Sequence, residues 1–374
     1  MSGFRRALPR LALSATALAF TLLLLEVAVR GIMAFDRNGL DEAFNRPLRA
    51  NGRELTLADL IRPNPDDLIV YELRPGVRGS FLGRPLSVNS LGMRDVERSR
   101  EKPPGAFRIV GLGDSHMFGW AVDRDETFLA LLENELHERF PDRHFEVLNL
   151  AVPGYNTVQE VEVLARRADE LDPDLVIINY VHNDMDLPNF LAERPNLSTP
   201  RKSYLLELVR RRLAVLRGGA ILPLGLFGVT PEEGTLRYRF DPARIPERYR
   251  PLAGWDNMVN AYGRLARLAR ERGIPAVLLF NWDDYRFRLS GRTSDARPKG
   301  VRQLGELCAR AGYLVVDPQD WIFRYLVENH LDSHALWISS SDSHTNPLRH
   351  RLVAEALLEQ LIQANALTPR KSLP

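Results

Sequence analysis

The stretch FRIVGLGDSH, residues 107–116, decides how the rest of the chain is interpreted. It starts with an apolar run of strand length and continues into glycines, which favour a tight turn. Such a strand–turn segment is typical of a parallel sheet, in which ligands bind beyond the carboxyl ends of the strands. Ser115 therefore lies where a reactive side chain is expected.

After residue 107, apolar runs of strand length alternate with amphipathic runs of helical length. The expected strands are 107–111, 145–150, 175–180, 276–280 and 313–316, and the expected helices are 127–140, 157–171, 255–272, 299–311 and 347–363. Repeated strand–helix units predict an α/β fold, a three-layer α/β/α sandwich around a parallel sheet. The run 175–180 is nearly all apolar, as expected of a central strand.

Two segments depart from this alternation. Residues 37–105 are polar and rich in Pro and Gly, with short strands such as 86–89, and are interpreted as an N-terminal extension to a domain at 106–366. Residues 186–254 form an insertion with a basic amphipathic helix at 204–216 and an apolar stretch at 220–229. The insertion could be a lid, a patch that touches a membrane, or a helix packed on the domain.

The amino terminus, residues 1–36, predicts a membrane anchor. Residues 11–25 carry no charge, basic residues precede them, and apolar character resumes after Glu26. This is long enough to cross a bilayer as a helix, and the basic flank places the amino terminus in the cytoplasm. A cleaved signal peptide and a buried soluble helix are the alternatives. Glu26 and Arg30 are spaced to pair on one helix face.

Composition excludes several classes of function. The chain has 374 residues with 50 basic and 48 acidic side chains, and a net charge of +2 gives no case for a nucleic-acid partner. Its single cysteine, Cys308, cannot form an intrachain disulfide and is expected in the core. No Cys/His cluster has the spacing of a zinc site. We expect neither a metal nor a cofactor.

The strand ends and the carboxyl-terminal loop together supply the groups for acyl transfer. A serine hydroxyl needs an adjacent base, which His344 can provide, and Asp342 can orient that imidazole because positions two apart in an extended segment share a side. The backbone N–H of Ser115, the N–H of Gly154 and the side-chain amide of Asn183 are the candidate oxyanion donors.

The catalytic base has a rival in the sequence. Asp-Ser-His occurs at 114–116, 332–334 and 342–344, so His334 with Asp332 repeats the pattern. We favour His344 because it abuts the last expected helix, where Asn346 can cap. His116 could line the site or be an ordinary turn residue.

These residues resemble the SGNH hydrolase superfamily, also called GDSL esterases, over about residues 107–366. The four family blocks correspond to Ser115, Gly154, Asn183 and His344. The resemblance implies a flavodoxin-like α/β/α fold and hydrolysis or transfer of acyl esters, often acetyl on carbohydrate, without metal or organic cofactor.

The resemblance has departures. His116 stands where the family name has leucine, and Val181 replaces a glycine usual before the third block. The acid lies two residues before the histidine rather than the commoner three, where Ser341 stands. The upstream run 89–94, Asn-Ser-Leu-Gly-Met-Arg, resembles membrane-anchored members, but the sequence gives it no chemical role.

The leading hypothesis is a membrane-anchored esterase with its catalytic domain outside the cytoplasm. It would cleave O-acetyl or other short-chain esters on carbohydrate or lipid through an acyl-enzyme on Ser115. An O-acetyltransferase acting on an exported polysaccharide is the alternative within enzymes. A non-catalytic protein that binds or assembles surface polymers is the third reading, since fold alone does not fix function.

Overall fold

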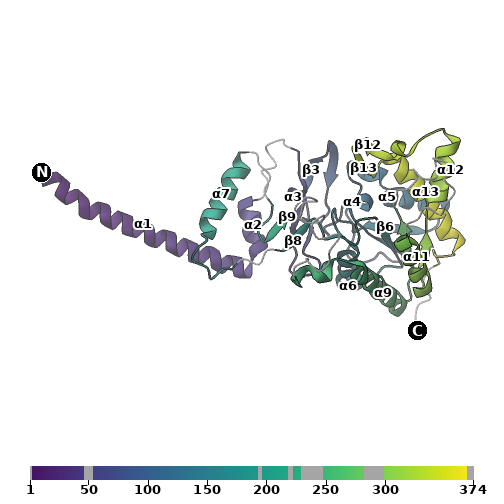
Figure 1. The fold of residues 1–374 in the computed structure, drawn as a ribbon, viewed down its shortest axis with the longest axis horizontal. Helices are drawn as coiled ribbons and strands as arrows, with labels where there is room; N and C mark the ends of the chain where they lie inside the picture. Colours follow the sequence, from purple (N-terminus) through teal and green to yellow (C-terminus); the bar gives the residue numbers. More distant parts are fainter. Residues whose placement is uncertain are drawn as a thin grey trace.

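The computed structural model describes residues 2–45, 54–192, 196–217, 222–228, 247–281 and 299–368. Within them the centre of the molecule is a five-stranded parallel sheet with the order β11-β10-β7-β5-β6 (Figure 1). Its strands are β5 (Ala106–Leu112), β6 (His144–Asn149), β7 (Leu175–Tyr180), β10 (Ala276–Phe280) and β11 (Leu314–Val316). All residues of β5, β7 and β10 are buried, which explains their unbroken apolar sequence.

Helices cover both faces of this sheet. They are α5 (Phe128–Arg139), α6 (Thr157–Leu171), α9 (Trp255–Arg272), α11 (Lys299–Ala311), α12 (Gln319–Glu328) and α13 (Pro347–Gln363). Helices α5, α12 and α13 pack together, while α6, α9 and α11 form a second group. The predicted α/β/α sandwich is therefore confirmed, and the chain reverses its direction across the sheet between β5 and β7, where such folds bind ligands.

The segment expected as an extension adds small elements to the same body. They are helix α3 (Leu57–Leu60) and strands β1 (Ile61–Pro63), β2 (Tyr71–Leu73), β3 (Arg78–Phe81) and β4 (Arg84–Ser87). Its buried side chains, such as Tyr71 and Met93, belong to the main hydrophobic core. Strand β4 ends before the expected 86–89 does, because the Asn89 side chain accepts from the N–H groups of Leu91 and Met93 and builds a turn.

A second, smaller core lies at the amino-terminal end of the molecule. Helix α1 (Ser2–Phe35) projects from the body, and α2 (Arg37–Asn45) and α7 (Tyr204–Leu216) pack around its end, beside the small sheet β8 (Phe190–Ala192) and β9 (Leu226–Gly228) (Figure 1). The amino-terminal core, as we call it, consists of Val29, Met33, Leu40, Tyr204, Leu208 and Leu224. The predicted helix at 204–216 is confirmed, whereas residues 220, 221 and 229 of the expected apolar stretch lie outside the described residues.

Among the described residues, one helix is long and apolar enough to cross a membrane. The segment is Ala12–Phe35, and its side chains are mostly exposed. A signal sequence near an amino terminus passes the same test of length and composition. The expected ion pair is present, with Arg30 Nε 2.8 Å from Glu26 Oε1.

Candidate active site

Ser115 is held at the start of a one-turn helix directly after the first strand of the sheet. Helix α4 (Ser115–Phe118) begins at Asp114, whose carboxylate accepts the His116 N–H at 2.9 Å, and it ends at Gly119 with φ of 89°. The side chain of Asp114 thus satisfies a donor that a helix leaves unpaired at its start. The sharp strand–helix turn presents the Ser115 hydroxyl beyond the carboxyl end of β5.

The Ser115 hydroxyl makes a hydrogen bond with the imidazole of a residue from the far end of the domain. His344 Nε2 lies 2.9 Å from Ser115 Oγ, and His344 Nδ1 lies 2.6 Å from Asp342 Oδ1. Asp342 and His344 belong to the short strand β13 (Asp342–Thr345), so their side chains share a face, as the spacing predicts. Nucleophile, base and acid candidates therefore form one continuous hydrogen-bonded chain.

The charge of Asp342 is favoured by its surroundings. Partial burial raises the pKa of this carboxyl, but hydrogen bonds from the backbone and ring of His344 and from the side chain of Trp120 outweigh burial and hold the pKa below its ordinary value. An ionised carboxylate at this point can fix the imidazole tautomer and stabilise the imidazolium form.

These groups match a known family. A sequence model of the GDSL-like lipase/acylhydrolase family matches residues 112–352. The chain belongs to this family. It is an SGNH-type ester hydrolase, with the fold and the general reaction that the sequence predicts.

Two solved structures are among those similar to this SGNH hydrolase. LAE5, an alpha/beta hydrolase from the metagenome of Lake Arreo in Spain, is 17% identical, with 72% of this chain and 99% of that chain covered and a TM-score of 0.43. An acetylxylan esterase from Geobacillus stearothermophilus is 14% identical, with 68% and 94% covered and a TM-score of 0.40. Among curated proteins, none matches the chain. The family assignment therefore rests on the sequence match.

Two aromatic rings stack against the imidazole of His344. The ring centroids of Trp120 and His116 each lie 5.0 Å from that of His344, with interplanar angles of 21° and 29°. Trp120 also packs edge-on against Phe81 of β3. His116 is bonded through Nδ1 to Thr345 Oγ1 at 2.9 Å, and burial, followed by the charge of His344, lowers its pKa well below the usual value. A neutral His116 and Trp120 thus fix the plane of the His344 ring.

The candidate oxyanion donors lie on neighbouring loops. Gly154 has φ of 79°, and a Cβ there would come within 2.4 Å of the Asn189 side chain, so a larger residue does not fit. Asn183 follows β7, and its side chain makes a hydrogen bond with Asp114. This bond connects it to the turn at residues 113–119 that carries Ser115, the candidate nucleophile, which we call the nucleophile turn. Asn189, which the sequence gave no reason to select, closes this loop by donating its backbone N–H to Gly154 O at 3.1 Å.

The upstream run 89–94 acts on the nucleophile turn through Arg94. Its buried guanidinium donates to the carbonyl oxygen of Phe118 at 2.9 Å and also to those of Gly119 and Val122. These carbonyls close helix α4 and the loop after it, where the last carbonyl groups of a helix have no N–H donor of their own. Burial lowers the pKa of Arg94 to about 10, so it stays charged at neutral pH. Sequence reasoning missed this contact because it joins residues far apart in the chain.

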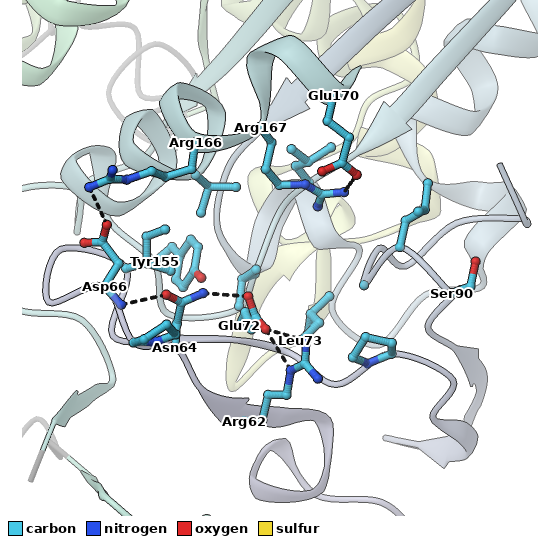
Figure 2. A pocket seen from close by; sticks show the side chains of 18 of the residues that line it. Arg62, Asn64, Asp66, Glu72, Leu73, Ser90, Tyr155, Arg166, Arg167 and Glu170 are labelled. Carbon is cyan, nitrogen blue, oxygen red and sulfur yellow. Dashed lines mark hydrogen bonds and ion pairs between the residues drawn. The ribbon is translucent and has the colours of Figure 1, made fainter. Parts of the chain in front are cut away.

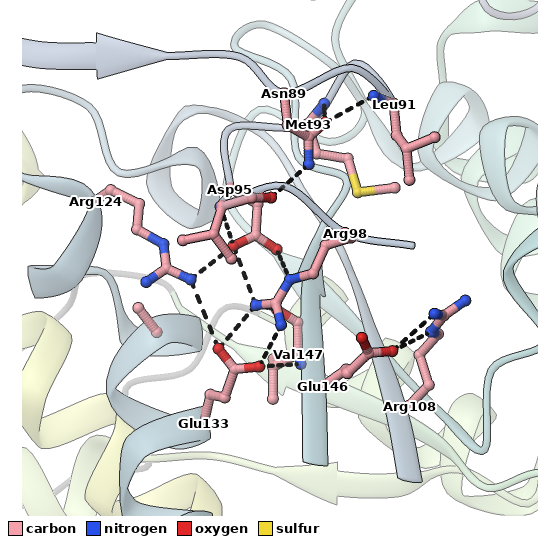
Figure 3. A network of polar contacts seen from close by, with 12 residues as sticks. Asn89, Leu91, Met93, Asp95, Arg98, Arg108, Arg124, Glu133, Glu146 and Val147 are labelled. Carbon is pink, nitrogen blue, oxygen red and sulfur yellow. Dashed lines mark hydrogen bonds and ion pairs between the residues drawn. The ribbon is translucent and has the colours of Figure 1, made fainter. Parts of the chain in front are cut away.

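A second set of charges fixes the segment that carries Arg94. Arg98 bonds to Asp95 at 3.0 Å and to Glu133 of α5 at 2.8 Å, and Arg124 bonds to Asp95 at 2.7 Å (Figure 3). Each guanidinium thus faces at least one carboxylate in a partly buried setting. The network connects the loop after Met93 to helix α5, which follows Ser115 in the chain.

The loop that carries Gly154, a candidate oxyanion donor, is supported from β2. The Tyr71 hydroxyl donates to Pro153 O at 3.1 Å, and the Tyr155 hydroxyl donates back to Tyr71 O. Both rings are buried and meet edge to face with centroids 5.1 Å apart. The residues on either side of Gly154 are therefore positioned by Tyr71 of β2.

Behind this loop lies a cavity of about 610 Å³ between the 62–100 segment and helix α6. Its polar wall consists of paired charges, including Arg62 with Glu72 at 2.6 Å and Arg166 with Asp66 at 2.7 Å (Figure 2). Ser115 and His344 are not among its lining residues. These pairs dock the segment onto α6, so we interpret the cavity as separate from the reacting groups.

Two buried carboxyl groups lie near the nucleophile turn. Burial, followed by the charge of Asp184, raises the pKa of Glu160 well above its usual value, and burial with the charge of Asp114 does the same for Asp184. Within the described residues neither oxygen of Glu160 has a hydrogen-bond partner. These groups favour the neutral form and were not singled out by their sequence pattern.

The rival base is placed differently. His334 Nδ1 lies 3.3 Å from Asp332 Oδ1, and both side chains are largely exposed. Among the described residues, the imidazole bonded to Ser115 is that of His344. Cys308 is buried in the core, and no group of three or more His, Cys, Asp or Glu side chains in the described part of the chain is arranged to hold a metal ion.

Proposed function

We propose that this protein is a membrane-anchored serine esterase that removes O-acetyl or other short acyl groups from carbohydrate or lipid through an acyl-enzyme on Ser115. The observation that carries the proposal is the continuous chain of bonds from Ser115 through His344 to Asp342. Ser115 is only 9% exposed, which supports a compact acyl group over a bulky one.

The reaction follows from this arrangement. His344 Nε2 takes the proton from Ser115 Oγ as the oxygen attacks the ester carbonyl, and the carbonyl oxygen becomes an oxyanion. The N–H groups of Ser115 and Gly154 and the amide of Asn183 are the proposed donors to that oxyanion, each of a kind whose loss costs about 3 kcal/mol of transition-state stabilisation. His344 then gives its proton to the departing alkoxide oxygen, which leaves as an alcohol.

Deacylation repeats these steps with water. His344 accepts a proton from the water as it attacks the acyl-enzyme, the new tetrahedral intermediate collapses, and the proton returns to Ser115 Oγ while the carboxylic acid leaves. If a sugar hydroxyl takes the place of water, the same acyl-enzyme performs O-acetyl transfer. Transfer to an exported polysaccharide is the second candidate, and it is supported by the anchor that would hold the site beside the membrane.

The anchor is proposed to remain attached. Val29 and Met33 of α1 are buried against α2 and α7, so removal of the helix would expose the amino-terminal core. The basic residues before the apolar segment favour a cytoplasmic amino terminus. We accordingly propose an anchor at 1–36, an extension at 37–105 and a hydrolase domain at 106–366 with its insertion at 186–254, the domain lying outside the cytoplasm.

A panel of acyl esters tests the substrate class. The full chain is expected to hydrolyse acetyl and other short-chain esters faster than long-chain ones, and a Ser115→Ala variant is expected to hydrolyse none of them. Preference for long acyl chains would overturn the short-chain assignment. In a mixture of acetyl donor and oligosaccharide, acetate without acetylated sugar supports hydrolysis, and acetylated sugar supports transfer.

A further inference from the structure

Helix α7 has one buried face and one exposed apolar face. Tyr204, Leu208 and Val215 are buried against the body. The side chains of Leu206, Val209, Leu213 and Leu216 are between 45% and 51% exposed. Their spacing of three and four residues places them on one side of the helix. We call these four residues the α7 stripe.

Exposed basic residues border the stripe. Arg210 lies one turn from both Leu206 and Leu213, and Arg217 lies one turn after Leu213. A helix with an apolar stripe flanked by arginines is typical of one that lies in the surface of a membrane, with its cations near lipid phosphates. A contiguous apolar patch on a soluble surface also marks an interaction site.

The first turn of α7 is fastened to α1. The Glu26 carboxylate accepts the N–H groups of Tyr204 and Leu205, each at 2.9 Å, and the Ser203 hydroxyl at 2.8 Å. Arg30 donates to Lys202 O at 2.7 Å and to Leu197 O, and it lies over the Tyr204 ring. The start of α7 is thereby held at the level of Glu26 on α1.

That level is close to where a bilayer would end. The helix from Arg10 to Glu26 is about 24 Å long at about 1.5 Å per residue, which is about 6 Å less than the roughly 30 Å hydrocarbon core of a bilayer, so Glu26 lies within about one helical turn of the boundary. Large side chains before Glu26, such as Leu23 and Leu24, are exposed, whereas beyond it one face with Val29 and Met33 is buried by protein and Ile32 stays exposed. In Figure 1 helix α7 runs across the end of α1 rather than along it.

We propose that α7 lies in the interface of the same bilayer that α1 crosses, with its stripe at the acyl-chain boundary and Arg210 and Arg217 near lipid phosphates. This inference rests on the proposed anchoring by α1. The hydrolase domain would then be held at two points on the membrane rather than hinged on one helix, which fixes the height and tilt of the active site above the lipid.

Quenching by brominated acyl chains tests the proposal in the full-length protein. Single cysteines that carry an environment-sensitive fluorophore are introduced by Val209→Cys in the stripe and by Val327→Cys on α12. Val327 is a similarly exposed valine, and α12 lies at the far end of the molecule (Figure 1). Leu23→Cys reports insertion of α1. The parent chain, with buried Cys308 only, gives the background label. All are reconstituted in phosphatidylcholine–phosphatidylglycerol vesicles.

We expect quenching of about twofold or more at positions 23 and 209, because a stripe residue would reach the acyl boundary, and none at position 327. Quenching at 23 without quenching at 209 would overturn the proposal while leaving the anchor intact. Absence of quenching at both positions would overturn the anchoring and the proposal together. Equal quenching at 209 and 327 would contradict a specific role for α7.

Discussion

The main core and the amino-terminal core are built in different ways. The main core packs a continuous sheet between two groups of helices, and the loops at its edge bring Ser115, His344 and Asp342 together. The amino-terminal core has six buried hydrophobic residues among those that the structure describes, and the polar contacts of Glu26 and Arg30 connect its helices. The comparison teaches that the first region is suited to fixing the groups of the proposed active site, and that the second is suited to fixing the domain on the proposed anchor α1.

The largest expected effect is the loss of activity when one of the proposed reacting groups of the main core is removed. Ser115→Ala and His344→Ala should each lower kcat/KM for an acetyl ester by roughly 10⁴-fold or more, because each removes a group that acts as part of one unit. His334→Ala should retain most activity, since its side chain is exposed and paired with Asp332. The reverse ranking of the two histidines, measured on folded proteins, would contradict the assignment.

Arg94 tests how the main core supports the nucleophile turn. Arg94→Ala leaves the carbonyls of Phe118 and Val122 without the Arg94 donor, while that of Gly119 still accepts the Val122 N–H at 3.3 Å. Unpaired buried polar groups cost about 1–3 kcal/mol each, so the free energy of unfolding should fall by several kcal/mol. Chemical denaturation measures this loss. Arg78→Ala, at an exposed position on β3, is the control, and an equal effect there would contradict the role of Arg94.

Glu160 gives the main core a distinctive pH dependence. Burial raises its folded pKa, so its contribution to stability is present below the unfolded pKa and is lost as pH rises through the folded value. One such proton changes the free energy of unfolding by at most about 1.4 kcal/mol per pH unit. Glu160→Gln should therefore flatten the decline of stability above pH 5. Exposed Glu138→Gln is the control, and parallel curves for Glu160→Gln and the wild type would count against this explanation.

The smallest effect is expected in the amino-terminal core. Glu26→Ala removes the acceptor for the first N–H groups of α7, and loss of a helix cap costs about 1 kcal/mol. Hydrogen exchange should show faster opening of the first turn of α7, with the strands of the main sheet unchanged. If the sheet amides lost the same protection, the two cores would form one cooperative unit, and the contrast between them would fail.

Much of the main core could be predicted because its sequence is periodic. Helices α6, α9, α11 and α13 and strands β7 and β10 have the bounds that apolar spacing predicts, and so does α7 in the smaller core. Ser115, His344 and Asp342 were found because their residue types and positions at strand ends or beside a helix cap are informative. Their roles stay predictions that the tests above address.

The contacts that sequence could not reveal join distant residues through space. Arg94 contacts Gly119, Tyr71 contacts Pro153, and Glu26 contacts Tyr204, which lies 178 residues later in the chain. Neither hydrophobic periodicity nor a local motif encodes such pairs. The stacking of His116 and Trp120 on His344 is of the same kind, because ring planes depend on packing rather than on spacing along the chain.

The most direct test of the central claim is to map a fluorophosphonate adduct by mass spectrometry of the full-length protein. A single adduct on the peptide that contains Ser115 is predicted in the wild type, with none in Ser115→Ala. The His344→Ala variant should react far more slowly, since it lacks the base 2.9 Å from the hydroxyl. An adduct at another residue, or no adduct on a protein that unfolds cooperatively on heating, would contradict Ser115 as the nucleophile.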